Sequence, residues 1–395
     1  MLTDEQIEKI IFKYTSRQDE FNMAVMEVIA GRLSRIAEFD RLGILEKEVT
    51  IRKDVVRINR LYEEYVKKQT QGLEEDLWWI ALALYAEALP FYDNPSTLRK
   101  NAELMELTST MTSEIQKSLT SAIKNPVFVI RDLKSPSVLK AQNLEKTYRS
   151  VLTEAQMYSN VSKSLQDIAL KRTETQLFDS GVRYAIDNSS DNAKDTTSAN
   201  VVIRGNVLEN IKKFINKMQD VMGKQFGANA LELSAHIYPA PDHAPAQGHQ
   251  FSYEEVEKMQ AGDNFKDLQG HSYVGFVRNI GEWNCRHYFM RIKKGAKQTV
   301  SQEKLDKILE DNERGYTDSK GKHRTLYECT QIQRRYEREI RKAKEKYLYG
   351  KALNDKEMMS KARNRVGKLT TQYKQFSQLC DIPAKLERIK VKDYR

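Results

Sequence analysis

Hydrophobic residues recur every three or four positions through the first 125 residues, which is the spacing of one face of a helix. The pattern begins at Ile7 and continues in successive stripes to Met111. Its most apolar stretch, residues 77–89, is shorter than a membrane span and is followed directly by proline. We therefore predict an N-terminal helical domain over residues 1–125 and expect no membrane contact.

The next segment, residues 126–200, has weaker patterns. Val127 to Ile130 have the composition of a short strand, whereas residues 139–178 return to helical spacing. Residues 188–200 are rich in Ser, Asp, Asn and Thr, as loops commonly are. The segment is therefore predicted to be a helical connector with a polar loop.

Alternation replaces helical spacing beyond residue 230. Leu231 and Leu233 alternate with Glu232 and Ser234, the period-two pattern of a half-buried strand. Two further strand-like segments follow before the helical pattern resumes. We predict a small α+β core over residues 201–300, with one small mixed sheet formed from residues near 230–236, 272–278 and 286–292.

Helical spacing returns at residue 301 and predicts long basic helices over residues 301–395. Ile332, Tyr336 and Ile340 form an apolar stripe in the first part of this region. Seven cations are expected to turn outward from that stripe: Arg334, Arg335, Arg338, Arg341, Lys342, Lys344 and Lys346. The predicted fold is thus α+β and predominantly helical, with the small sheet enclosed between helical regions.

The charge of the chain is distributed unevenly. Residues 301–395 contain 25 Lys and Arg against 15 Asp and Glu, whereas residues 1–300 contain 40 of each, so the net charge of +10 belongs to the last quarter. This asymmetry favours an anionic partner, either nucleic acid or the acidic face of a protein. The alternative is a solvated basic helix without a dedicated partner.

Histidine and cysteine gather between residues 236 and 287, in the order His236, His243, His249, His271, Cys285 and His287. On a strand, Cys285 and His287 share a face, and with His236 and His243 they offer a ligand set for zinc. The alternative is that the histidines hold the loop by hydrogen bonds and Cys285 is a small buried residue. No third group is evident that would orient Cys285 as a nucleophile, and no Walker or dinucleotide motif is present.

The same region resembles a known family. It reads Leu-Glu-Leu-Ser-Ala-His at 231–236, Pro-Asp-His-Ala-Pro-Ala-Gln-Gly at 241–248 and Trp-Asn-Cys-Arg-His at 283–287. With the helix Tyr-Glu-Cys-Thr-Gln-Ile-Gln-Arg-Arg-Tyr-Glu-Arg-Glu-Ile-Arg that begins at Tyr327, these motifs are similar to those of the phage minor capsid protein 2 family. Ala240 and Ala246 stand where that family usually has Arg and Trp.

The resemblance implies a virion protein of a tailed bacteriophage, related to the Mu F-like head morphogenesis proteins. Such a protein is made in the host cytoplasm, is present in few copies and is expected inside the head, near the portal. Its expected partners are the portal and capsid proteins, with contact to packaged DNA through the basic C-terminal region. The family has no established enzymatic activity.

A second hypothesis is a metal-dependent, nuclease-like hydrolase that uses the His/Cys cluster with zinc. Metal-assisted hydrolysis usually needs carboxylates nearby, and Asp242 and Glu282 are the close ones in sequence. We favour the assembly protein, because two separate motifs in the correct order support it. The three cysteines are widely spaced and indicate no disulfide framework, which agrees with a reducing compartment.

Overall fold

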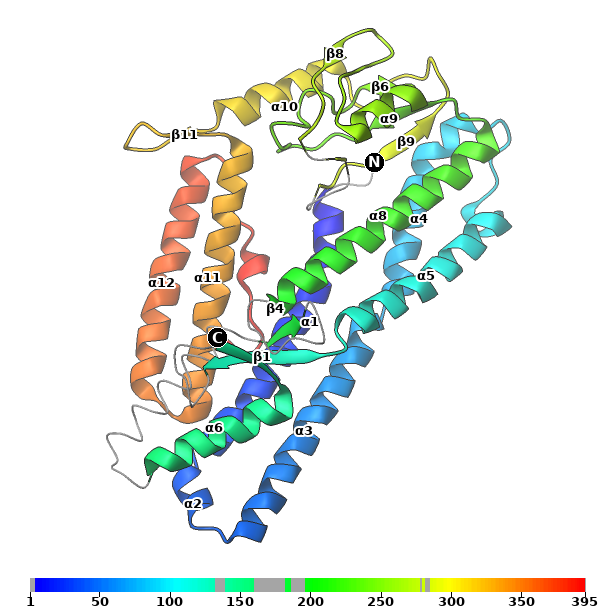
Figure 1. Ribbon diagram of the computed structural model, residues 1–395. Helices are drawn as coiled ribbons and strands as arrows, with labels where there is room; N and C mark the ends of the chain where they lie inside the picture. The colour runs from blue at the N-terminus through cyan, green and yellow to red at the C-terminus, as the bar shows by residue number, and fades with distance from the viewer. Residues whose placement is uncertain are drawn as a thin grey trace.

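The computed structural model describes residues 4–131, 139–159, 182–185, 196–277, 279–280 and 285–394. Over these residues the chain is mainly helical with short strands, which confirms the predicted predominantly helical α+β class (Figure 1). Every strand pairing between described residues is antiparallel, so the predicted mixed sheet is wrong in that detail.

The N-terminal region is helical, as its spacing predicts, and no strand occurs among residues 4–122. Its helices are α1 (Asp4–Leu33), α2 (Ile36–Asp40), α3 (Ile44–Thr70), α4 (Leu73–Ala88) and α5 (Ala102–Ala122). Two short 3₁₀ turns, η1 (Leu89–Phe91) and η2 (Leu98–Lys100), lie between α4 and α5. Pro90 lies in η1 and helps to end α4, since proline cannot continue a helix interior.

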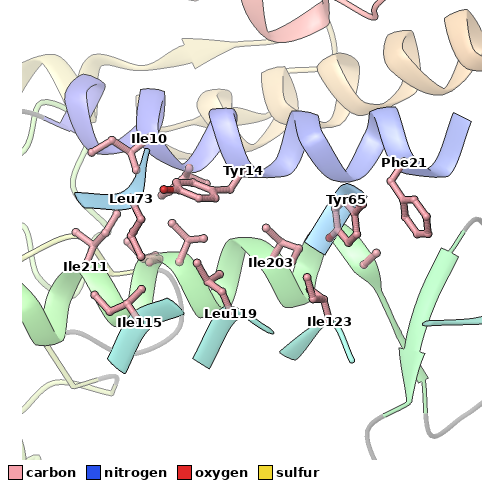
Figure 2. Close-up of a cluster of buried hydrophobic side chains, with 14 of the residues drawn as sticks. Ile10, Tyr14, Phe21, Tyr65, Leu73, Ile115, Leu119, Ile123, Ile203 and Ile211 are labelled. Atoms are coloured by element: carbon pink, nitrogen blue, oxygen red, sulfur yellow. The ribbon is translucent and has the colours of Figure 1, made fainter. Parts of the chain in front are cut away.

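The main core forms where α1, α4 and α5 pack around the long helix α8 (Ala199–Phe226). Figure 2 shows Ile10 and Tyr14 of α1, Leu119 of α5 and Ile203 of α8 in this core. Burying a side chain of this size contributes roughly 1.5–3 kcal/mol. The core joins residues on both sides of position 200, and the division into units at 125, 200 and 300 stays a prediction.

A four-stranded sheet in the order β2-β1-β3-β4 follows α5. It contains β1 (Pro126–Arg131), β2 (Leu139–Asn143), β3 (Val182–Ala185) and β4 (Thr196–Ser198), and α6 (Leu144–Ser159) follows β2. The strand predicted at Val127 is confirmed, but helix was wrong for β2 and loop was wrong for β4. Pairing with neighbouring strands decides these short segments. Residues 160–178 and 188–195, predicted as helix and loop, lie outside the described residues.

A three-stranded sheet in the order β6-β5-β9 lies above the end of α8. Its strands are β5 (Ala230–Leu233), β6 (Gln250–Phe251) and β9 (Phe289–Ile292), so two of the three predicted strands are confirmed. The third was wrong: β8 (Ser272–Tyr273) pairs with β7 (Phe265–Lys266) in a separate hairpin beyond α9 (Tyr253–Ala261). With only two residues, β6 has no periodicity that a sequence pattern could reveal.

Burial in β5 differs from the predicted half-buried strand, because all four residues are buried. Glu232 is 1% exposed, and its carboxylate accepts hydrogen bonds from the side chain of Gln250 and from the backbone N–H of Thr299, both at 2.9 Å. A buried carboxylate needs such donors to offset its lost hydration. Glu232 therefore connects β5 to β6 through Gln250, and to the segment after β9 through Thr299.

The C-terminal region begins with α10 (Gln302–Arg314) and the hairpin of β10 (Tyr316–Thr317) and β11 (His323–Arg324). Two long helices follow, α11 (Leu326–Leu353) and α12 (Lys356–Leu379), and the 3₁₀ turn η4 (Leu386–Ile389) comes last. Asn354 turns the chain between them with φ 59°, and the Asp355 side chain caps α12 by accepting from the N–H of Met358. Among the helices in the described part of the chain, none is long and apolar enough to span a bilayer.

Candidate functional site

Three of the four residues predicted to bind zinc converge on one point. The Cys285 sulfur lies 3.6 Å from Nδ1 of His243 and 3.5 Å from Nδ1 of His287. The three donor atoms all lie within 4.8 Å of one another. His236 lies beside them, with its ring centroid 4.1 Å from that of His287, but it is not one of the three converging donors.

Strand pairing explains why residues so far apart in sequence meet. β5 and β9 run antiparallel with Leu233 opposite Phe289, so the residues after β5 lie beside those before β9. The loop after β5 returns to the same strand, where the N–H of Gly248 donates to the carbonyl of Leu233 at 2.7 Å. Gly248 has φ 76°, which favours glycine, and the closed loop holds His243 over the start of β9.

The cluster is largely enclosed. His243 is 2% exposed and His287 4% exposed, whereas Cys285 is half-buried. Burial, followed by the nearby positive groups, lowers the pKa of His287 well below its usual range, so its imidazole is neutral at physiological pH. Nε2 of His287 lies 3.4 Å from the side-chain amide oxygen of Gln247. The same oxygen accepts a hydrogen bond from the backbone N–H of His236. Asp242 places a carboxylate oxygen 3.7 Å from Nε2 of His243.

A second polar cluster was not predicted. One carboxylate oxygen of Asp267 lies 2.9 Å from Nδ1 of His249 and 2.8 Å from Nδ1 of His271, and accepts from the Tyr273 hydroxyl at 2.9 Å. Burial would raise the pKa of Asp267, but the hydrogen bonds from His271 and Tyr273 lower it overall. The sequence shows both histidines but gives no signal for Asp267, because the loop geometry creates the partnership. Glu282 lies outside the described residues.

Part of the predicted basic face of α11 points into the protein, where Arg334 meets Glu8 of α1. Glu8 of α1 is 8% exposed at its side chain and is surrounded by four guanidinium groups, which we call the Glu8 network. Its nitrogen–oxygen distances are 2.8 Å to Arg204, 3.3 Å to Arg286, 3.4 Å to Arg334 and 3.6 Å to Arg388. Burial alone would raise the pKa of Glu8, but the arginines lower it far below its usual range.

Arg341 and Lys344 also point into the protein. Arg341 donates to the backbone carbonyl of Arg388 at 2.7 Å, and Lys344 donates to that of Ile389 at 2.7 Å. The expectation that all seven predicted cations turn outward is therefore wrong for Arg334, Arg341 and Lys344. The reason is that α11 packs on α1, on α12 and on the C-terminal turn η4, which provides the acceptors for Arg341 and Lys344.

The remaining cations of α11 are more open. Arg335, Arg338 and Lys342 are exposed, and Lys346 is half-buried. A cleft of about 390 Å³ lies between α1, the start of α8 and this side of α11. Its carboxylates include Asp19 and Glu345; burial, and then their neighbouring carboxylates, raise the pKa of both.

Helix α12 supplies a further outward basic surface beside the exposed cations of α11. It carries six Lys and Arg against one Glu, and all six cations are exposed. We call this set the α12 face: Lys356, Lys361, Arg363, Arg365, Lys368 and Lys374. In Figure 1 the helix lies at the outer edge of the molecule, with α11 between it and α1. Its charge density was visible in the sequence, but its position was not.

Comparison with known proteins agrees with the resemblance carried by the motifs. A search of curated proteins and one of solved structures found no significant match. The family model described as "Phage minor capsid protein 2" matches residues 2–378, which is nearly the whole chain. A match of this extent includes the helical N-terminal region, which lies outside the quoted motifs. The chain therefore belongs to the phage minor capsid protein 2 family, and it is a structural protein of the bacteriophage virion.

Proposed function

We propose that this minor capsid protein acts in head assembly near the portal, inside the head, and that its α12 face contacts packaged DNA. The observation that carries the proposal is the exposure of all six cations of α12 on one outer helix. Lys and Arg that neutralise phosphates release condensed counterions, and this gain does not depend on base sequence. A protein that touches DNA of any sequence in a filled head needs this kind of contact.

Protein contacts are supported by a different part of the surface. At the start of α3 the apolar side chains of Ile44 and Leu45 are 91% and 78% exposed, and Val49 and, further along the helix, Val56 are also exposed. Adjacent exposed apolar side chains of this kind often mark protein interaction sites. We assign this end of α3 to contact with a portal or capsid protein, well separated in the fold from the α12 face (Figure 1).

The DNA contact is tested with the full chain and two variants of equal charge. Lys361, Lys368 and Lys374 are changed to Gln in one variant. In the matched control, the exposed lysines Lys53, Lys67 and Lys117 are changed instead. Binding to a random-sequence duplex is measured by fluorescence anisotropy at several salt concentrations.

We expect the wild type and the control to bind with Kd of ~10⁻⁴–10⁻⁶ M at physiological salt, and the α12 variant to bind more weakly. The slope of log K against log salt should decrease by about 2–3 when three phosphate contacts are removed. Equal losses in both variants would show that net charge and not the α12 face is responsible. Undetectable DNA binding at low salt, with tight binding of portal protein through α12, would reverse the assignment.

Mass spectrometry of purified virions tests the assembly role. The α12 variant should still be incorporated in the wild-type amount, because the proposed protein contact lies on α3. Loss of the variant from virions, despite normal folding, would place an assembly contact on α12.

A further inference from the structure

We propose that His243, Cys285 and His287 bind one zinc ion, which fastens the loop after β5 to the start of β9. The proposal concerns a structural site and is independent of the proposed DNA contact. It rests on the position of three donor atoms, their enclosure and the residues that orient them.

The distances between the donors fit a tetrahedral zinc site. Zinc lies about 2.3 Å from a cysteine sulfur and about 2.0–2.1 Å from a histidine nitrogen, so a tetrahedral angle places sulfur and nitrogen about 3.5–3.6 Å apart. The sulfur of Cys285 lies 3.6 Å from Nδ1 of His243 and 3.5 Å from Nδ1 of His287. Both sulfur–nitrogen edges of the coordination shell are therefore already present.

The chemistry of the donors selects the metal. Thiolate and imidazole are ligands of zinc and other soft or borderline metals, whereas magnesium and calcium prefer oxygen donors. Zinc is not redox-active, and in structural sites it is almost always bound by four ligands in a tetrahedron. Two imidazoles and one thiolate are therefore a donor set that suits zinc better than magnesium or calcium.

The outer nitrogens of both histidines face oxygen acceptors. Nε2 of His287 lies 3.4 Å from the amide oxygen of Gln247, and Nε2 of His243 lies 3.7 Å from a carboxylate oxygen of Asp242. Histidines that bind metals usually donate their second N–H to such a group, which fixes the ring and the tautomer. In His287 this contact directs Nδ1 to the centre of the cluster. The 3.7 Å separation at His243 exceeds hydrogen-bond distance, and its Nδ1 is placed by the contact with the Cys285 sulfur.

Three protein ligands leave one coordination position for His236 or for water. The ring of His236 packs on that of His287 at the end of β5, with 4.1 Å between the centroids. A fourth protein ligand would close the shell, as in structural zinc sites, whereas water would leave it open. The spectrum of the cobalt-substituted protein distinguishes these two cases.

The second polar cluster provides an internal control. His249, Asp267 and His271 also bring donor atoms within 4.8 Å of one another. Their shared carboxylate oxygen, however, already contacts both Nδ1 atoms and the hydroxyl of Tyr273 at hydrogen-bond distance. That cluster is explained by hydrogen bonds, and we assign no metal to it.

The test measures metal content and the cobalt spectrum of the full, untagged chain after chelator treatment. We expect one equivalent of zinc to bind, and cobalt to give a tetrahedral visible spectrum with a thiolate-to-cobalt charge-transfer band. Cys285→Ser should abolish the charge-transfer band and weaken zinc binding by at least ~10-fold, while His271→Ala should leave both unchanged. Circular dichroism shows whether each variant is folded.

His236→Ala resolves the fourth position. A changed ligand-field spectrum would assign His236 as the fourth ligand, and an unchanged one would assign water; either supports the site. Failure of the folded wild type to bind one equivalent of zinc, or a charge-transfer band that persists in Cys285→Ser, would overturn it. Zinc-dependent cleavage of DNA that is lost in Cys285→Ser would overturn the structural role.

Discussion

The two long C-terminal helices have similar compositions and opposite surroundings. α11 and α12 are both rich in Lys and Arg and pack side by side, joined at Asn354 and Asp355 (Figure 1). In α11 the side chains of Arg334 and Arg341 meet carboxylates of α1, at Glu8 and Asp19. In α12 all six cations face solvent. Part of the positive charge of α11 therefore holds the fold together, whereas all the positive charge of α12 lies at the surface.

The difference arises from what each helix packs against. α11 contacts α1 and α12, whereas α12 packs chiefly on α11. A cation that enters the protein interior has to meet an anion or a carbonyl, since an isolated buried charge is very costly. α1 provides these anions from the opposite end of the sequence. Charge on a helix consequently says little about its role until its neighbours are known.

The largest effect is expected when the anion of the Glu8 network is removed. Glu8→Gln leaves four guanidinium groups without their shared carboxylate, and breaking a buried ion pair in this way typically costs about 3–5 kcal/mol. Urea denaturation of the full chain measures the loss. Glu5→Gln, on the exposed side of the same helix, is the matched control and should change the free energy of unfolding by less than about 0.5 kcal/mol.

Acid should remove the same stabilisation from the wild type. Since the folded state lowers the pKa of Glu8, its contribution is fully present above the unfolded pKa of about 4.3 and is lost as pH falls further. The difference in stability between wild type and Glu8→Gln should therefore shrink below about pH 4. A difference that stays constant from pH 7 to pH 3 would contradict the role of the charge.

A smaller effect is expected when one of the four arginines of the Glu8 network is replaced. Burial and the neighbouring arginines lower the pKa of Arg334 to about 10, which means that the folded state disfavours this fourth positive charge. Arg334→Met keeps the length of the side chain and removes the charge. We expect the free energy of unfolding to change by less than about 1 kcal/mol, because three guanidinium groups remain around Glu8 and no buried charge is left unpaired. A loss as large as that of Glu8→Gln would show that the charge of Arg334 is itself required.

The smallest effect concerns Glu345 on the cleft side of α11. Burial and the nearby Asp19 raise the pKa of Glu345, against the attraction of Arg341 and Lys342. A carboxyl with a raised pKa destabilises the fold above its unfolded pKa of about 4.3. Glu345→Gln should therefore raise Tm by about 1–3 °C at pH 8 and have no effect at pH 4.

Glu339→Gln is the matched control for that prediction. Glu339 lies on the same helix but pairs with Arg365 at 2.9 Å on the exposed side. Its substitution should leave Tm unchanged or slightly lower at pH 8. An increase in both variants would indicate a general effect of reducing charge on α11.

Local pattern predicted the elements well where a helix or strand has one buried face. The helical region before residue 125 and the pairing segments near 230 and 290 follow directly from their periodicity. Period two was nevertheless misleading about burial, because Glu232 is enclosed by hydrogen-bond donors. The two-residue strand β6 and the strand β2 depend on their neighbours, so no local pattern reveals them.

The site residues divide in the same way. His243, Cys285 and His287 could be grouped from the sequence because their residue types are rare and the strand register brings them together. The inward turn of Arg334 could not be predicted, since its carboxylate on α1 is 326 residues away. Electrostatic partners separated so widely leave no mark on local spacing. The full exposure of the α12 cations, against the partial burial of the α11 cations, follows from the same long-range packing.

The Glu8 network can be completed only late in the synthesis of the chain. Glu8 leaves the ribosome near the beginning of translation, and Arg388 follows 380 residues later. At about 5–20 residues per second, roughly 20–75 s pass before this last guanidinium is available. Over that interval α1 can form as a helix, but Glu8 lacks the guanidinium group of Arg388. A nascent chain that stops before η4 would have an incomplete Glu8 network. Ribosome-stalled chains of increasing length should therefore gain protease resistance only when Arg388 has emerged.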